Sequence, residues 1–123
     1  MSKQATPLTL IDLNGTACCP PISEQRLPAD TATALAPAFK ALGDPVRLQL
    51  MSMIASAPGG EICVCDLTPS FEVGSSTISH HLKTLRDAGL VDAERRASWV
   101  YYRARPGLMR QLATLLTPQD ADA

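Results

Sequence analysis

The chain has 123 residues, of which 46% are hydrophobic and only 4% aromatic, and its formal net charge is −1. This length gives room for one domain, and the scarcity of aromatic residues favours helices packed on helices over a β-sandwich. No stretch approaches the roughly 18 consecutive apolar residues of a membrane span, and residues 1–13 do not resemble a secretory signal. We therefore expect a cytoplasmic protein with no membrane partner.

The first 30 residues differ from the rest of the chain in their turn-forming residues. Four prolines and a glycine interrupt any periodic pattern in residues 1–30, which predicts a flexible arm. This arm carries the adjacent cysteines Cys18 and Cys19. Residues 118–123 are polar and are expected to form a frayed tail, so the folded domain is predicted over residues 31–117.

Three helices are predicted in the first half of this domain. The first covers residues 31–42 and ends at Gly43, because glycine adopts left-handed backbone at little cost. Asp44 as N-cap and Pro45 at the first helical position begin the second helix, which stops at residues 58–60. A third, short helix is expected from Cys63 to Ser70.

The clearest helical pattern follows, from Ser75 to Ala88. Apolar residues recur there with the helical period on one face, polar residues occupy the opposite face, and Gly89 ends the helix. Two strands are predicted at residues 90–95 and 98–104, joined by a short turn, and an amphipathic helix begins at Pro106. This order predicts a mainly α winged helix-turn-helix fold (α+β), with about five helices and a two-stranded β-wing.

Polar and basic residues gather where such a fold contacts DNA. The start of the second helix of the motif reaches base edges in the major groove. Residues 80–110 hold seven bases and three acids, whereas the rest of the chain holds four bases and nine acids, and clustered positive charge suits a phosphate-facing surface. A basic surface that only faces solvent would explain the clustered charge. It would not explain the polar face of the helix. The predicted DNA-binding residues are Ser75, Ser76, Thr77, Ser79, His80, Lys83, Arg95, Arg96 and Arg103.

Three segments together resemble the ArsR/SmtB family of metal-responsive repressors, over roughly residues 34–116. They are the run from Phe39 to Leu48, the box Cys63-Val-Cys-Asp-Leu67, and the run from Thr77 to Val91. The resemblance implies a homodimer joined by its first and last helices. It also implies that the metal-free protein binds double-stranded operator DNA and represses transcription, and that bound metal releases it.

The sequence departs from the family pattern at three places. Glu72 stands where the turn of the motif usually has glycine, and Gly74 stands where serine or threonine would cap the recognition helix. Glycine is a tolerable N-cap. The last helix carries no histidine or acidic residue of the kind that builds the family's zinc site there, so a zinc sensor using that site is not expected.

The four cysteines form two close pairs, Cys18–Cys19 and Cys63–Cys65. Such pairs in a reducing compartment indicate metal or redox chemistry, and thiolates select soft ions. Positions i and i+2 of a helix diverge by about 200°. Cys63 and Cys65 can therefore share one ion only if Cys63 precedes or caps its helix. By contrast, the adjacent His80 and His81 point about 100° apart on a helix and make a poor metal pair.

The predicted metal site joins Cys18, Cys19 and Cys63, with Cys65 as a fourth ligand or as a buried, non-ligating thiol. Three thiolates suit As(III) or Sb(III) as the inducer, whereas four would suit Cd(II) or Pb(II). The resemblance implies that cysteines of the arm meet the box of the other subunit.

Two other classes of function fit the sequence less well. A thiol redox switch on the same fold would need positive charge near the cysteines, but the neighbouring charged residues Glu24, Glu61 and Asp66 are acidic. An enzyme would need a nucleophile with its base or a phosphate-binding loop, and we find neither pattern. We therefore predict no enzymatic activity and no protein substrate.

Overall fold

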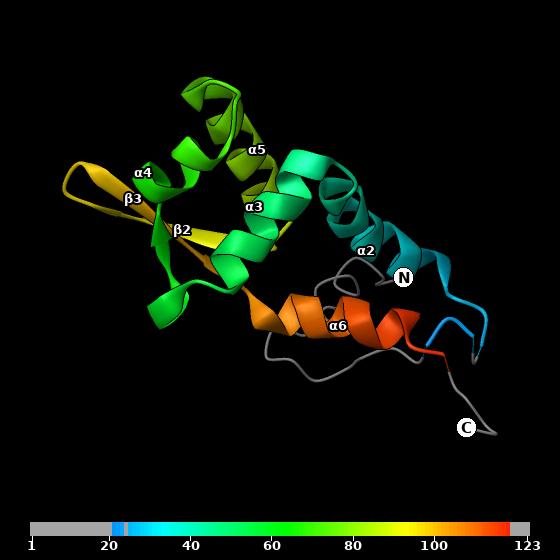
Figure 1. Ribbon diagram of the computed structural model, residues 1–123. Coiled ribbons are helices and arrows are strands. Elements are labelled where there is room, and N and C mark those ends of the chain that lie inside the picture. Colours follow the sequence, from blue (N-terminus) through cyan, green and yellow to red (C-terminus); the bar gives the residue numbers. More distant parts are fainter. Residues whose placement is uncertain (1–20, 24, 119–123) are drawn as a thin grey trace. The chain divides into compact units, whose positions relative to one another are not determined.

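The computed structural model describes residues 21–23 and 25–118 (Figure 1). They belong to two compact units: residues 38–105 form one, and the residues up to Pro37 form the other together with those from Pro106 onward. Helix α2 (Ala29–Leu42) begins two residues before the predicted start and contains Pro37, at the boundary between the units. Proline has no backbone N–H, so the helix lacks one hydrogen bond there.

Three further helices lie in the unit of residues 38–105. They are α3 (Pro45–Ala55), α4 (Val64–Leu67) and α5 (Ser75–Asp87), with 3₁₀ turns at Pro58–Gly60 and Thr68–Ser70. As predicted, Asp44 caps α3, and its carboxylate accepts hydrogen bonds from the backbone N–H groups of Val46 at 3.0 Å and Arg47 at 3.1 Å. The predicted helix over residues 63–70 is thus a single α-helical turn followed by a 3₁₀ turn.

The wing is part of a three-stranded antiparallel sheet. Strands β2 (Val91–Arg96) and β3 (Trp99–Ala104) form the expected ribbon, and β1 (Ile62–Cys63) pairs with the other side of β3. The sequence did not predict β1, because two residues are too few to show the alternation of a strand. Its pairing places Cys63 directly opposite Tyr101.

The core of this unit is aliphatic, as its composition predicts. Helix α3 packs against α5 and β3, and α5 packs against β2. The largest fully buried side chains, each worth roughly 1.5–3 kcal/mol on burial, are Leu50, Ile54, Leu67, Ile78, Leu82, Leu85, Leu90 and Val91. This core fixes one face of α5 and leaves the opposite face in solvent.

The turn between α4 and α5 accommodates two of the three departures from the family pattern, Glu72 and Gly74. Within the described residues, Ala97 is the one non-glycine residue with a positive φ. Glu72 therefore has an ordinary backbone conformation, and replacing glycine there causes no backbone strain. Gly74 is the N-cap of α5, with φ −70° and ψ 164° and no side-chain capping bond. The recognition helix therefore forms without the usual hydroxyl cap.

The second unit contains helix α6 (Pro106–Leu116). Leu108, Leu112 and Leu115 of this helix are buried, whereas Leu116 is 56% exposed. The backbone N–H of Ile22 donates to the carbonyl of Leu115 at 3.0 Å, which joins the chain before α2 to the end of α6. None of the helices described is long and apolar enough to cross a membrane.

Candidate DNA interface and cysteine pair

Helix α5 presents a polar face next to a buried apolar face. Ile78, Leu82 and Leu85 are fully buried, which orients the helix on the core. The predicted DNA-reading residues of this helix are all exposed: Ser75, Ser76, Thr77, Ser79, His80 and Lys83. Lys83 donates to Asp87 at 2.8 Å in an exposed i,i+4 pair, an interaction weak enough for a phosphate to replace. The structure thus brings these six side chains together on one accessible surface.

The adjacent histidines of α5 have different surroundings. His80 is exposed, whereas the side chain of His81 is 15% exposed and its Nδ1 lies 3.1 Å from Nη1 of Arg47. Arg47 also donates from Nε to the carbonyl of Ala41 at 2.6 Å, and His81 Nε2 lies 4.0 Å from the Asp44 carboxylate. His81 therefore links α5 to the start of α3, while the side chain of His80 remains exposed.

The three wing arginines predicted to bind DNA lie on two different faces of the sheet. Arg95 pairs in register with Val100, and Arg96 pairs with Trp99; neighbouring residues of a strand point to opposite faces. Arg95 shares the face of Val91, which is buried against the core. Arg96 and Arg103 lie on the other face. The sequence alone did not distinguish these positions.

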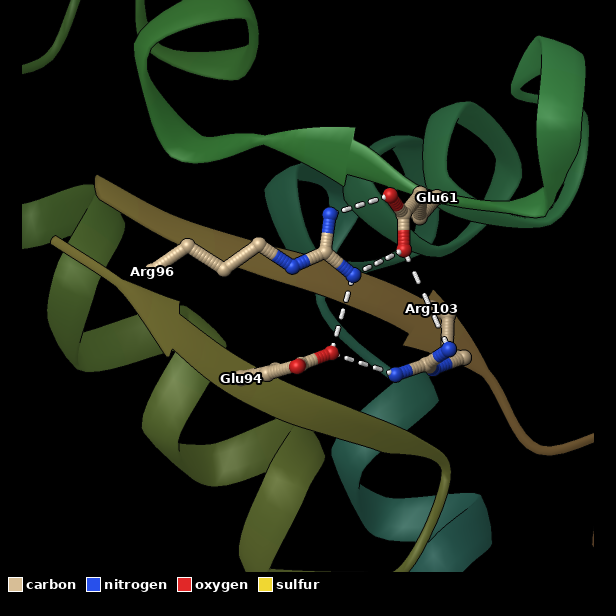
Figure 2. Close-up of polar contacts among 4 residues, drawn as sticks. All are labelled: Glu61, Glu94, Arg96 and Arg103. Atoms are coloured by element: carbon tan, nitrogen blue, oxygen red, sulfur yellow. Dashed lines mark hydrogen bonds and ion pairs between the residues drawn. The ribbon is translucent and has the colours of Figure 1, made fainter.

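Arg96 and Arg103 are held by carboxylates (Figure 2). Arg96 binds Glu61 with both terminal nitrogens, at 2.6 and 2.8 Å, and also binds Glu94 at 2.9 Å. Arg103 donates to the same Glu94 oxygen at 2.9 Å. The hydrogen bonds from Arg96 are the main reason that the pKa values of Glu61 and Glu94 are lowered. Among the described residues, no ion pair involves Arg95.

Glu61 and Glu94 were not predicted from the sequence as partners of these arginines. A charge balance reveals an excess of bases but not which acids lie beside them. The alternation of β2 would have placed Glu94 and Arg96 on one face. Glu61 could not be placed in this way, because its position depends on the unpredicted strand β1.

The cysteine box has the geometry required for a shared ligand. Cys63 is the N-cap of α4, with extended backbone at φ −76° and ψ 146°. Its sulfur accepts from the backbone N–H of Cys65 at 3.4 Å and from the Cys65 thiol at 2.8 Å. The helical divergence of about 200° does not apply, because Cys63 lies outside the helix. Both sulfurs can therefore contact one thiophilic ion.

The surroundings of Cys65 disfavour a reactive thiolate. Its pKa is raised to about 11, first by the hydrogen bond that its thiol donates to Cys63 and further by the negative charge of Asp66. Thiol oxidation proceeds through the thiolate, so these neighbours act against a redox switch at this pair. A thiophilic ion would instead displace the thiol proton when it binds.

The remaining predicted ligands, Cys18 and Cys19, lie outside the described residues. Within the part of the chain that the structure describes, no three His, Cys, Asp or Glu side chains gather as a metal site. A cavity of about 540 Å³ adjoins the box, and its lining includes Cys63, Asp66, Glu61 and Tyr101. Of the two thiols of the box, Cys63 is buried and lines this cavity. Cys65 is exposed, so the expectation that it could be a buried thiol is wrong.

A polar recognition helix, its preceding helix and a β-wing define a winged helix-turn-helix protein of the DNA-binding class. Residues 44–93 match the family model described as "Bacterial regulatory protein, arsR family". The chain is 33% identical to ArsR2 of Halobacterium salinarum over 102 residues, which cover 83% of this chain and 82% of that protein. The protein belongs to the ArsR family.

Two other comparisons agree with this assignment. The chain is 48% identical over 64 residues to the arsenical resistance operon repressor of Bacillus subtilis, covering 52% of this chain and 59% of the repressor. It resembles the solved structure of an ArsR-like transcriptional regulator from Rhodococcus sp. RHA1, with 26% identity and a TM-score of 0.59, over 68% of this chain and 76% of that one. These relatives are transcription regulators and not enzymes, as the sequence predicted.

Proposed function

We propose that this protein is a transcriptional repressor that binds operator DNA as a homodimer and leaves it when cysteine thiolates bind a metal(loid), most readily arsenite or antimonite. The observation that carries the proposal is the position of the converging Cys63–Cys65 pair. The pair begins α4, the helix directly before the recognition helix α5. A ligand there acts on the element that supports the DNA-reading surface.

The DNA-binding part of the proposal rests on α5 and the wing. The exposed start of α5 offers hydroxyls and an imidazole to base edges, and its buried face holds these groups on a rigid core. Arg95 offers an exposed guanidinium on the wing, and a phosphate is a suitable partner for it. Similarity to the Bacillus subtilis arsenical resistance operon repressor supports the same role.

The inducer is proposed from the donor atoms. Soft thiolates prefer thiophilic ions, and As(III) or Sb(III) takes three sulfurs. Because two thiols converge in the box, we propose that Cys18 and Cys19 of the arm complete the site, in the dimer from the other subunit. Three of these four thiolates would bind As(III) or Sb(III), whereas a site that uses all four would favour Cd(II) or Pb(II). The exposed apolar residues Ile22 and Leu116 are available for the dimer contact.

Release depends on linkage between the two sites. An inducer can lower DNA affinity only if it binds better to a conformation that binds DNA poorly. An ion that joins the box to the arm would restrain α4 and thereby alter the orientation or the mobility of α5. The proposal therefore requires that DNA weaken inducer binding by the same factor by which the inducer weakens DNA binding.

The proposal is tested by fluorescence anisotropy of labelled operator DNA with the full-length protein. Arsenite, antimonite, Cd(II), Pb(II) and Zn(II) are added separately to the preformed complex. We expect arsenite and antimonite to release the DNA at the lowest concentrations and Zn(II) to be weakest. Release by Cd(II) or Pb(II) alone would favour the four-thiolate site, and DNA that stays bound with every ion would contradict the proposal.

A further inference from the structure

Cys63 and two of the wing arginines, Arg96 and Arg103, lie on the same face of the sheet. Cys63 is paired with Tyr101 in register, and directly paired residues of antiparallel strands share a face. Glu61, two residues before Cys63, points to that face as well and binds Arg96 and Arg103 there (Figure 2). The guanidinium of Arg96 also lies 4.5 Å from the centre of the Tyr101 ring, close enough for a cation–π contact.

The position of Glu61 depends on the strand that contains Cys63. β1 has only two residues, and the pairing of Ile62 and Cys63 with β3 sets the position of the backbone at the residue before it. Glu61 and Cys63 also line the same cavity of about 540 Å³. A ligand that joins Cys63 to Cys65 would hold β1 against α4, and with it the carboxylate of Glu61.

Glu61 and a DNA phosphate are competitors for the same guanidinium groups. Carboxylates and phosphates both bind the arginine fork with two parallel hydrogen bonds. The Glu61 side chain is 28% exposed and those of Arg96 and Arg103 are 42% and 46% exposed, so phosphates can reach these arginines. When Glu61 holds them, the positive charge that they offer to DNA is neutralised.

We propose that Glu61 is a positioning residue that transmits occupancy of the Cys63–Cys65 pair to the wing. Ligand on the cysteines fixes Glu61 beside Arg96 and Arg103, and the wing loses its hold on the phosphates. Without ligand, β1 shifts more easily, and the DNA phosphates compete successfully with Glu61 for Arg96 and Arg103. This inference rests on the proposed function, since it presupposes that a thiol-bound ligand lowers DNA affinity.

The test compares full-length wild type with Glu61→Gln, using arsenite as the ligand. Asp92→Asn is the matched control, because Asp92 lies on the same sheet face and pairs with Arg105 at 3.2 Å, away from β1. Both variants remove one negative charge, so both should bind DNA more tightly without arsenite. Trp99, the only tryptophan of the chain, faces Arg96 across the ribbon, and its fluorescence reports on the wing.

We expect arsenite to lower DNA affinity about fivefold less in Glu61→Gln than in wild type, and to leave its Trp99 emission unchanged. Asp92→Asn should respond like wild type by both measurements. Arg96→Gln, which breaks the same contact from the wing, should also lose the Trp99 response. Arsenite binding, followed by thiolate-to-arsenic absorption, should be equal in all four proteins.

The inference is overturned if Glu61→Gln keeps both the wild-type release ratio and the Trp99 response. It is also overturned if Glu61→Gln fails to bind arsenite, since Glu61 would then act on the ligand site itself. A wild-type protein that keeps its DNA in arsenite would contradict the proposed function instead, so the two failures are distinguishable.

Discussion

The thiols of Cys63 and Cys65 lie 2.8 Å apart because Cys63 caps α4 instead of belonging to it. In a continuous helix, the two side chains would point to nearly opposite sides. The capping position bends the chain so that the two sulfurs lie next to each other, and Cys63 also lines the cavity. Helical periodicity would place these two cysteines on opposite sides of a helix. The structure instead brings them together as two ligands of one candidate metal site.

This relationship predicts similar effects for the two single cysteine substitutions. Cys63→Ser and Cys65→Ser should each weaken arsenite binding by at least about tenfold, because loss of a ligand costs no less than loss of an outer-shell partner. Thiolate-to-arsenic absorption during titration measures this affinity. If Cys65→Ser binds arsenite as wild type does, Cys65 is not a ligand and the site has three thiolates without it.

The division of roles between α5 and the wing predicts two kinds of DNA-binding defect. Thr77→Ala should reduce the preference for operator over random DNA by about 1–3 kcal/mol, the value of one base contact. Arg95→Ala should weaken binding to both DNAs alike and lower the salt dependence by about one phosphate contact. Filter binding at several salt concentrations distinguishes them. Sequence preference lost in Arg95→Ala and retained in Thr77→Ala would reverse the assignment.

The neighbouring histidines predict opposite outcomes for stability and DNA binding. His81→Ala should lower the unfolding temperature, because it removes the contact between α5 and Arg47. His80→Ala should leave the unfolding temperature unchanged and reduce operator preference, because His80 is exposed on the reading face. Thermal unfolding followed by circular dichroism tests the first effect. Equal unfolding temperatures for the two variants would contradict the positioning role of His81.

The cap of the recognition helix predicts a stabilising substitution. Gly74→Ser should stabilise the fold by about 0.5–1 kcal/mol, because serine reduces the freedom of the unfolded chain and supplies a capping oxygen. A Cβ at Gly74 meets no atom within 4 Å, and φ there is −70°. The control is Gly59→Ser, which also has open space but a φ of +78°, so it should destabilise by about 1 kcal/mol. Urea unfolding measures both, and a destabilised Gly74→Ser would contradict the N-cap geometry.

The sequence predicted those parts of the structure that depend on local signals. Gly43, Asp44 and Pro45 separate α2 from α3 through backbone preferences, and the apolar period of residues 78–85 identifies the buried face of α5. It could not predict β1, since a strand of two residues is defined by its partner 40 positions away, as Ile62 pairs with Tyr102. The contacts of Glu61 were missed for the same reason.

The central claim is that thiolates of this protein bind an inducer that releases operator DNA. Its most direct test is the anisotropy of labelled operator DNA during arsenite titration, with wild type and the double variant Cys18→Ser/Cys19→Ser. Both proteins should bind the operator equally without arsenite, because the arm lies outside the helix-turn-helix. We predict that arsenite releases the DNA from wild type and not from the double variant. Release from both at the same arsenite concentration would contradict the account.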